Sequence, residues 1–132
     1  MTKQEVVDLL VANGYTDRGS YAVYNAYLLF KRLPERVTKH AGCLTNEHKV
    51  SFEVRIHDPL PVPYSKHSCS MHIVGQYAEN RWCDLNIYSE SLDNLAKNFQ
   101  QHEDDLASAW ESMCYRRSRI PNSGYVDVEE SD

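Results

Sequence analysis

Hydrophobic residues in the first third of the chain recur at helical spacing. Thr2 and Glu5 form a capping box, apolar residues follow every three or four positions, and Asn13-Gly14 stops the pattern. In "YAVYNAYLLFKRL", residues 21–33, the spacing is again helical up to Pro34, and the basic end suits the negative end of a helix dipole. These patterns predict two N-terminal helices. The apolar face of the second consists of Val23, Ala26, Tyr27 and Phe30.

The middle of the chain changes to a period of two. In "KVSFEVRIHD", residues 49–58, Val50, Phe52, Val54 and Ile56 alternate with polar residues, which is typical of a strand with one buried and one wet face. The preceding "RVTKHAGCL", residues 36–44, is expected to pair with it through the "TNEH" turn. The prolines of "DPLPVPYSK" predict a stiff loop, and a second hairpin is expected over residues 66–88, turning at "AEN".

An apolar stripe after Ser91, the expected N-cap, predicts a long final helix. The acidic run Glu103-Asp104-Asp105 is expected to face solvent. The stripe consists of Leu92, Leu95, Phe99, Leu106, Ala109, Trp110 and Met113.

Together these elements predict one α+β domain over residues 1–120, followed by a flexible acidic tail at 121–132. The domain should hold two N-terminal helices, a four-stranded mainly antiparallel sheet of two hairpins, and a long C-terminal helix. The chain has 132 residues, of which 42% are hydrophobic and 25% charged, and this suits a single core. Its start matches neither a signal peptide nor a membrane span, so we expect a cytoplasmic protein without membrane association.

The charge balance argues against general nucleic-acid binding, because 14 Lys and Arg stand against 19 Asp and Glu. Two basic clusters still provide a nucleic-acid alternative, in which Trp82 or Tyr88 stacks on a base. Capping of helix C-termini is the commoner role for such residues. The clusters are Lys31, Arg32, Arg36, Lys39 and His40, and Arg116, Arg117 and Arg119.

The stretch "SKHSCSMH", residues 65–72, raises the question of a metal site. In a strand, His67 and Cys69 share one face and His72 lies on the other, while Cys83 is expected opposite Gly75, roughly 20 Å from Cys69. A structural zinc needs four convergent ligands at compact spacing. We therefore expect no metal and no cofactor, and we interpret the four cysteines as reduced thiols.

Enzymatic chemistry finds little support in the sequence. P-loop, G-x-S-x-G and H-E-x-x-H motifs are absent. Cys43, near His40 and His48, is the best candidate nucleophile, but the alternation places it on the core side. A metal-dependent or thiol enzyme is therefore the least favoured hypothesis.

The most informative feature is the outward set on the last predicted strand, Trp82, Asp84, Asn86 and Tyr88, because aromatic rings among polar neighbours are typical of recognition surfaces. We predict a partner-binding surface of Trp82, Asp84, Tyr88 and His72. The alternative is that the N-terminal helices cover this face and make Trp82 a core residue. We expect a small non-enzymatic binding protein that docks on a protein partner or on a second copy of itself, as an inhibitor or adaptor of phage or mobile-element type.

Overall fold

The computed structural model describes the backbone of residues 1–33, 50–60, 68–78 and 81–118, and the side chains of those ranges except at 76–78, 81–88 and 113–118. In chain order the elements are α1 (Lys3–Ala12), β1 (Thr16–Tyr21), the 3-10 turn η1 (Ala22–Tyr24), β2 (Ala26–Arg32), β3 (Val50–His57), β4 (Cys69–Ala78), β5 (Arg81–Glu90) and α3 (Leu92–Ser118).

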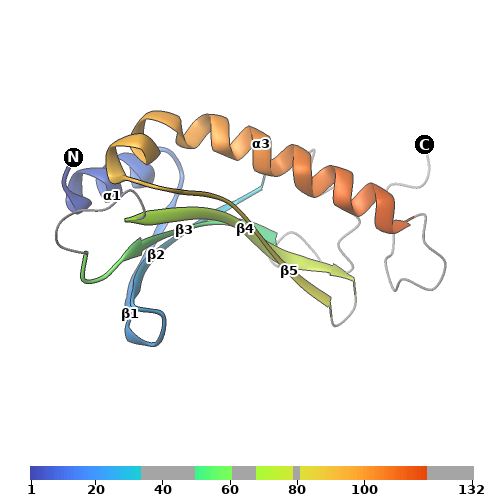
Figure 1. Cartoon of the computed structure of the whole chain (residues 1–132), viewed down its shortest axis with the longest axis horizontal. Helices are drawn as coiled ribbons and strands as arrows, with labels where there is room; N and C mark the ends of the chain where they lie inside the picture. The colour runs from blue at the N-terminus through green and yellow to red at the C-terminus, as the bar shows by residue number, and fades with distance from the viewer. Residues whose placement is uncertain (34–49, 61–67, 79–80, 119–132) are drawn as a thin grey trace.

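The five strands form one antiparallel sheet in the order β1-β2-β3-β4-β5. Figure 1 shows α1 and α3 on the same side of this sheet, with α3 running along it. The α+β class is therefore as predicted, whereas the sheet has five strands instead of four. Within the described part of the chain, no helix is both long enough and apolar enough to cross a membrane.

The predicted first helix is confirmed as α1. The Thr2 hydroxyl accepts a hydrogen bond from the Glu5 backbone N–H at 3.1 Å, and the Glu5 carboxylate accepts one from the Thr2 N–H at 3.0 Å, which completes the capping box. Gly14 follows the helix with a φ of +99°, a conformation that favours glycine. Val6 and Leu10 are fully buried, so α1 contributes to the core.

The predicted second helix is wrong, because residues 21–32 belong to a hairpin. Asn25 has a φ of +50°, which reverses the chain between η1 and β2, and asparagine tolerates this region better than most residues. Leu29 on one face and Leu28 on the other are 0% and 5% exposed. Because both faces of this strand are buried, consecutive residues are apolar, and the resulting pattern resembles the apolar stripe of a helix. Pairing with β3 makes this segment a strand.

The strand predicted at residues 49–58 is confirmed as β3, and its four alternate apolar residues are all fully buried. The first predicted hairpin is wrong, because β2 pairs with one edge of β3 and β4 with the other. Residues 36–44, the expected partner, lie outside the described residues.

The second predicted hairpin is confirmed as β4 and β5. The register pairs Cys83 with Gly75, as expected from the sequence. A register shift between Met71 and His72 then places Tyr88 opposite Met71, so the simple alternation along β5 ends there.

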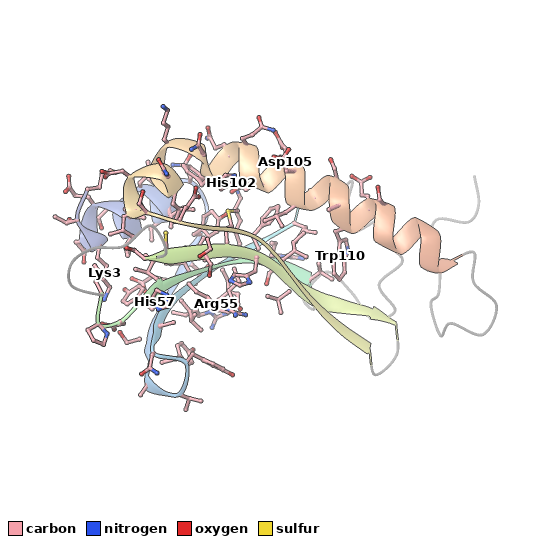
Figure 2. The ribbon with its side chains drawn as sticks, in the orientation of Figure 1. Lys3, Arg55, His57, His102, Asp105 and Trp110 are labelled. Atoms are coloured by element: carbon pink, nitrogen blue, oxygen red, sulfur yellow. The ribbon has the colours of Figure 1, made fainter. Side chains whose placement is uncertain are left out.

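The predicted C-terminal helix is confirmed as α3, and the Ser91 hydroxyl caps it by accepting a hydrogen bond from the Asn94 N–H at 3.2 Å. Asp104 and Asp105 are exposed as expected. Glu103 is not, because its side chain is only 15% exposed and accepts hydrogen bonds from Tyr15 and Lys31. Figure 2 shows Trp110 on the side of α3 that faces the sheet.

The core fills the space between the sheet and the two helices. Its largest fully buried side chains are Trp110, Phe52, Leu10, Leu29, Ile56, Met71, Ile73, Leu95 and Leu106.

Candidate functional site

Of the four residues predicted to bind a partner, the structure describes the side chain of His72 alone. Trp82, Asp84 and Tyr88 lie on β5, whose side chains at these positions fall outside the described residues. His72 is 2% exposed, which favours a covered face at this point. The predicted cover was the N-terminal helices, but α1 and α3 both lie on the opposite side of the sheet. A role for this set in binding a partner stays a prediction.

His72 belongs to a cluster of paired polar groups on the sheet face that points away from α3. Its Nε2 lies 2.6 Å from the Ser70 hydroxyl, and the Glu53 carboxylate forms an ion pair with Arg55. The register places His72 opposite Glu53 and Ser70 opposite Arg55. Glu53 is 6% exposed, although the alternation predicted a wet position. Each of these two contacts joins residues of one strand, Ser70 with His72 on β4 and Glu53 with Arg55 on β3, and the register brings the two pairs side by side.

The first basic cluster divides between two faces of β2. The Lys31 ammonium lies 3.1 Å from both carboxylate oxygens of Glu103, so Lys31 fixes α3 to the sheet. Arg32 is exposed on the opposite face, where it pairs in register with Ser51. Arg36, Lys39, His40 and Arg119 lie outside the described residues. Arg116 and Arg117 lie in α3, and their side chains are also outside the described ones.

The suspected metal ligands occupy different faces of β4. Cys69 is 1% exposed on the core side, and its thiol donates to the Glu90 carbonyl at 3.2 Å. Burial, and then the Glu90 charge, raise the pKa of Cys69 to about 12, so this thiol is a poor nucleophile. Among the described residues, no three His, Cys, Asp or Glu side chains are arranged to bind a metal ion. His67, Cys43 and His48 lie outside the described residues.

The sequence analysis missed the exposed tip of the β1–β2 hairpin. We call Tyr21, Ala22, Val23 and Tyr24 the hairpin tip. Val23 is 87% exposed, Tyr24 66% and Tyr21 40%, and the two tyrosine rings lie 6.3 Å apart. The available signal was the run "GSYAVYNAYLLF", residues 19–30, which holds no charged side chain.

Hydrogen bonds hold the hairpin tip in one conformation. The Asn25 N–H donates to the Ala22 carbonyl at 3.2 Å, and the Asp58 N–H donates to the Asn25 carbonyl at 3.0 Å. The Ser20 hydroxyl also donates to the Asp58 carboxylate. The tip is therefore anchored to the end of β3, which reduces the backbone entropy that is lost when its exposed side chains bind.

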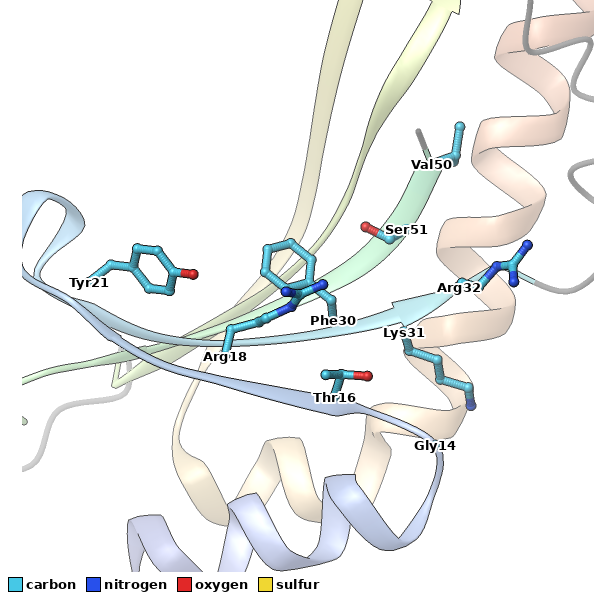
Figure 3. Close-up of a pocket in the computed structure, with 9 residues that line it drawn as sticks. All are labelled: Gly14, Thr16, Arg18, Tyr21, Phe30, Lys31, Arg32, Val50 and Ser51. Carbon is cyan, nitrogen blue, oxygen red and sulfur yellow. The ribbon is translucent and has the colours of Figure 1, made fainter. Parts of the chain in front are cut away.

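A groove of about 620 Å³ lies beside the hairpin, and we call it the β1 groove. Figure 3 shows the Arg18 guanidinium in front of the Phe30 ring, with Tyr21 on one side and Arg32 on the other. The Arg18 guanidinium carbon lies 5.8 Å from the Phe30 ring centroid, a cation–π contact. Among the residues that line the groove are Thr16, Arg18, Tyr21, Phe30, Arg32 and Ser51.

The edge of β1 that pairs with no other described strand is a poor site for adding a further strand. The register shifts between Asp17 and Gly19, and Gly19 has a φ of +77°. The Asp17 carboxylate accepts a hydrogen bond from the Gly19 N–H at 2.9 Å. Such bulges interrupt the regular row of donors and acceptors that strand addition needs.

Comparison with known proteins adds no assignment to these surfaces: no protein-family model matches the chain, and no curated protein or solved structure is detectably similar to it.

Proposed function

We propose that this chain is a non-enzymatic binding protein that docks on another protein by inserting the hairpin tip into an apolar pocket of that partner. The observation that carries the proposal is the exposure of Val23, Tyr24 and Tyr21. These are three of the five large hydrophobic residues that are exposed in the described part of the chain. Contiguous exposed apolar side chains mark interaction sites more often than scattered ones do.

The composition of the tip favours a protein partner. Its side chains are two tyrosines, a valine and an alanine, and tyrosine is enriched among the residues that dominate binding energy at protein interfaces. Because residues 19–30 hold no charge, the tip itself offers nothing to a phosphate backbone. The hydrogen-bonded turn further supports an anchor role, since a backbone that is already ordered loses less entropy on binding.

The polar cluster of β3 and β4 also supports a non-enzymatic role, because its described donors and acceptors bind one another and Cys69 is buried. Within the class of binding proteins, an inhibitor or adaptor of phage or mobile-element type and a cytoplasmic location stay predictions from the sequence. A second copy of the chain is the alternative partner.

The test compares capture by the wild-type chain with capture by V23D, both immobilised and exposed to a nuclease-treated lysate. V11D is the matched control, because Val11 is 46% exposed but lies on α1. We expect a protein that wild type and V11D retain and V23D loses. Measured with that purified protein, Y24S should weaken binding by roughly 30-fold, since an anchor contributes about 2 kcal/mol or more.

Two results would contradict the proposal. Retention of the same proteins by V23D and wild type would remove the tip from the interface. Concentration-dependent dimerisation abolished by V23D, with no foreign protein captured, would assign the tip to a second copy of the chain. Circular dichroism spectra of the variants must match that of wild type, which is expected because Val23 is 87% exposed.

A further inference from the structure

The β1 groove combines cationic side chains with aromatic rings. Exposed arginines lie at Arg18 and Arg32, and aromatic rings lie at Tyr21 and Phe30. Hydroxyl groups at Thr16 and Ser51 line the same space (Figure 3). The arginines can bind an anionic group of a ligand, the aromatic rings can stack on a planar group, and the hydroxyl groups can form neutral hydrogen bonds with the ligand.

Arg18 is held where a planar ligand can stack on it. Its guanidinium packs over Phe30, its side chain is exposed, and it forms no ion pair with the described residues. An arginine that lies on an aromatic ring presents a flat cationic face, which attracts both the π system of a base and a phosphate. Tyr21, 40% exposed, supplies a second ring at the open end of the groove.

Two acidic side chains of the described residues near the groove are held by cations. Glu53, which pairs in register with Phe30, forms an ion pair with Arg55. Glu103 is held by Lys31 and by the Tyr15 hydroxyl. The lining residues themselves include no acid, although the whole chain has a net charge of −5. Asp17, between Thr16 and Arg18, accepts hydrogen bonds from the Gly19 N–H and the Tyr27 hydroxyl and pairs in register with Leu29, so it lies on the other face of the sheet. Among the described residues, the lining of the groove therefore favours an anion.

The length and volume of the groove suit a ligand of nucleotide size or a short polymer. From Ala26, which pairs with Tyr21, to Arg32, strand β2 spans roughly 20 Å at about 3.3 Å per residue. The volume of about 620 Å³ lies within the usual range for small-molecule sites. An acidic peptide is less well matched, because the bulged edge of β1 cannot align its backbone.

We infer that the β1 groove binds a nucleotide unit, with the base stacked on Tyr21 or on the Arg18–Phe30 pair and the phosphate bound by Arg18 and Arg32. The unit comes either from single-stranded nucleic acid or from a free nucleotide. The groove shares Tyr21 with the hairpin tip, whereas Val23 and Tyr24 are not among its lining residues, and Arg18 and Phe30 do not belong to the tip. Substitutions at Val23 and at Arg18 therefore test the two proposals separately.

The test measures fluorescence polarisation of a labelled eight-nucleotide adenine DNA at about 50 mM salt, with AMP as an unlabelled competitor. R18A should weaken binding roughly tenfold, within the range that stacking and phosphate contacts contribute. F30L, which keeps an apolar side chain but removes the ring, should weaken it to a similar extent. K97A is the matched control, because it removes an exposed positive charge on α3.

Salt dependence provides a second readout. For a single strand, each phosphate contact contributes about −0.7 to the slope of log K against log salt concentration, so R18A and R32A should each reduce the slope by about that amount. V23D should leave oligonucleotide binding unchanged, which separates this site from the docking tip.

The outcomes divide clearly. Binding that R18A and F30L weaken and K97A does not would support the inference, and competition by AMP at comparable affinity would identify the free nucleotide as the source. Absence of binding by the folded wild type, or equal binding by R18A and K97A, would overturn it. Preferential binding of an acidic, tyrosine-containing peptide that R18A abolishes would also overturn it.

Discussion

Replacing Lys31 by methionine should destabilise the protein, because Lys31 fixes α3 to β2. The Lys31 ammonium lies 3.1 Å from each carboxylate oxygen of Glu103, and these side chains are 29% and 15% exposed. At 3.1 Å, Coulomb's law gives an attraction of about 1.3 kcal/mol with the dielectric constant of water and about 5 kcal/mol at an effective value of 20. Desolvation and side-chain entropy oppose this attraction. We expect a net loss of about 1–2 kcal/mol.

The variant K31M leaves Glu103 partly buried with the Tyr15 hydroxyl as a remaining donor, at 2.8 Å. Adding E103Q should therefore cost less in K31M than in wild type, and the coupling energy of the double-mutant cycle should be about 1 kcal/mol. Urea unfolding followed by circular dichroism measures all four proteins, with K97M as the control for loss of an exposed lysine. A coupling energy below about 0.3 kcal/mol would show that the Lys31–Glu103 pair does not stabilise the fold. Lys31 would then again be a candidate for binding nucleic acid.

Three further predictions concern single groups. Burial, and then the charge and hydrogen bond of Glu103, raise the pKa of Tyr15 far above 10. The protonated Tyr15 therefore contributes its full stabilisation below about pH 10. Above that pH the free energy of unfolding falls by up to about 1.4 kcal/mol per pH unit. Y15F should show a shallower decline than wild type when unfolding is measured from about pH 9 to 11, because Tyr27 and Cys69, whose pKa values are also raised, still contribute to it. Equal slopes would contradict the assignment. With a pKa of about 12, Cys69 should resist iodoacetamide at about pH 8 in the folded protein and react after unfolding in urea. Peptide mass spectrometry measures the labelling in each state. Rapid labelling of the native chain would show that the Cys69 thiol is accessible. S91A should lower the free energy of unfolding by about 1 kcal/mol through loss of the α3 cap, whereas S112A, at an exposed position within the same helix, should not. Equal effects of the two substitutions would show that Ser91 does not act as a cap.

The parts of the fold that were predictable from sequence are those where local pattern and tertiary packing agree. Thr2 and Glu5 cap α1, and Ser91 caps α3, through contacts between near neighbours in the chain. The alternation of β3 survives because α3 covers one face of it. The register of Cys83 with Gly75 was predictable because β4 and β5 are consecutive strands that pair directly with each other, even though the register shifts between Gln76 and Ala78.

The hairpin of β1 and β2 could not be predicted in the same way. Leu28 and Leu29 are both buried, on opposite faces, and an apolar run of this kind looks the same for a helix and for a strand covered on both sides. Residues 26–32 form a strand because they pair with β3, which lies far away in the sequence, and local propensity carries no information about such a distant partner. Missing this hairpin also meant missing both candidate surfaces, since the hairpin tip and the β1 groove exist only when residues 16–32 form strands.

Under the nucleotide proposal, the net charge of the chain and the charges inside the groove act over different distances. The value of −5 predicts weak attraction of polyanions at distances beyond a Debye length, which is about 8–10 Å at ordinary ionic strength. Within the groove, however, the field is set by the nearest groups, and Glu53 and Glu103 are each held by a cation. A chain that repels nucleic acid overall should therefore bind a nucleotide slowly but hold it locally. This predicts that raising salt accelerates association by screening the distant repulsion while it weakens the contacts to Arg18 and Arg32, and stopped-flow measurements on the labelled oligonucleotide separate the two effects. A fall in association rate with salt would show instead that the long-range field of the folded chain is positive on this side.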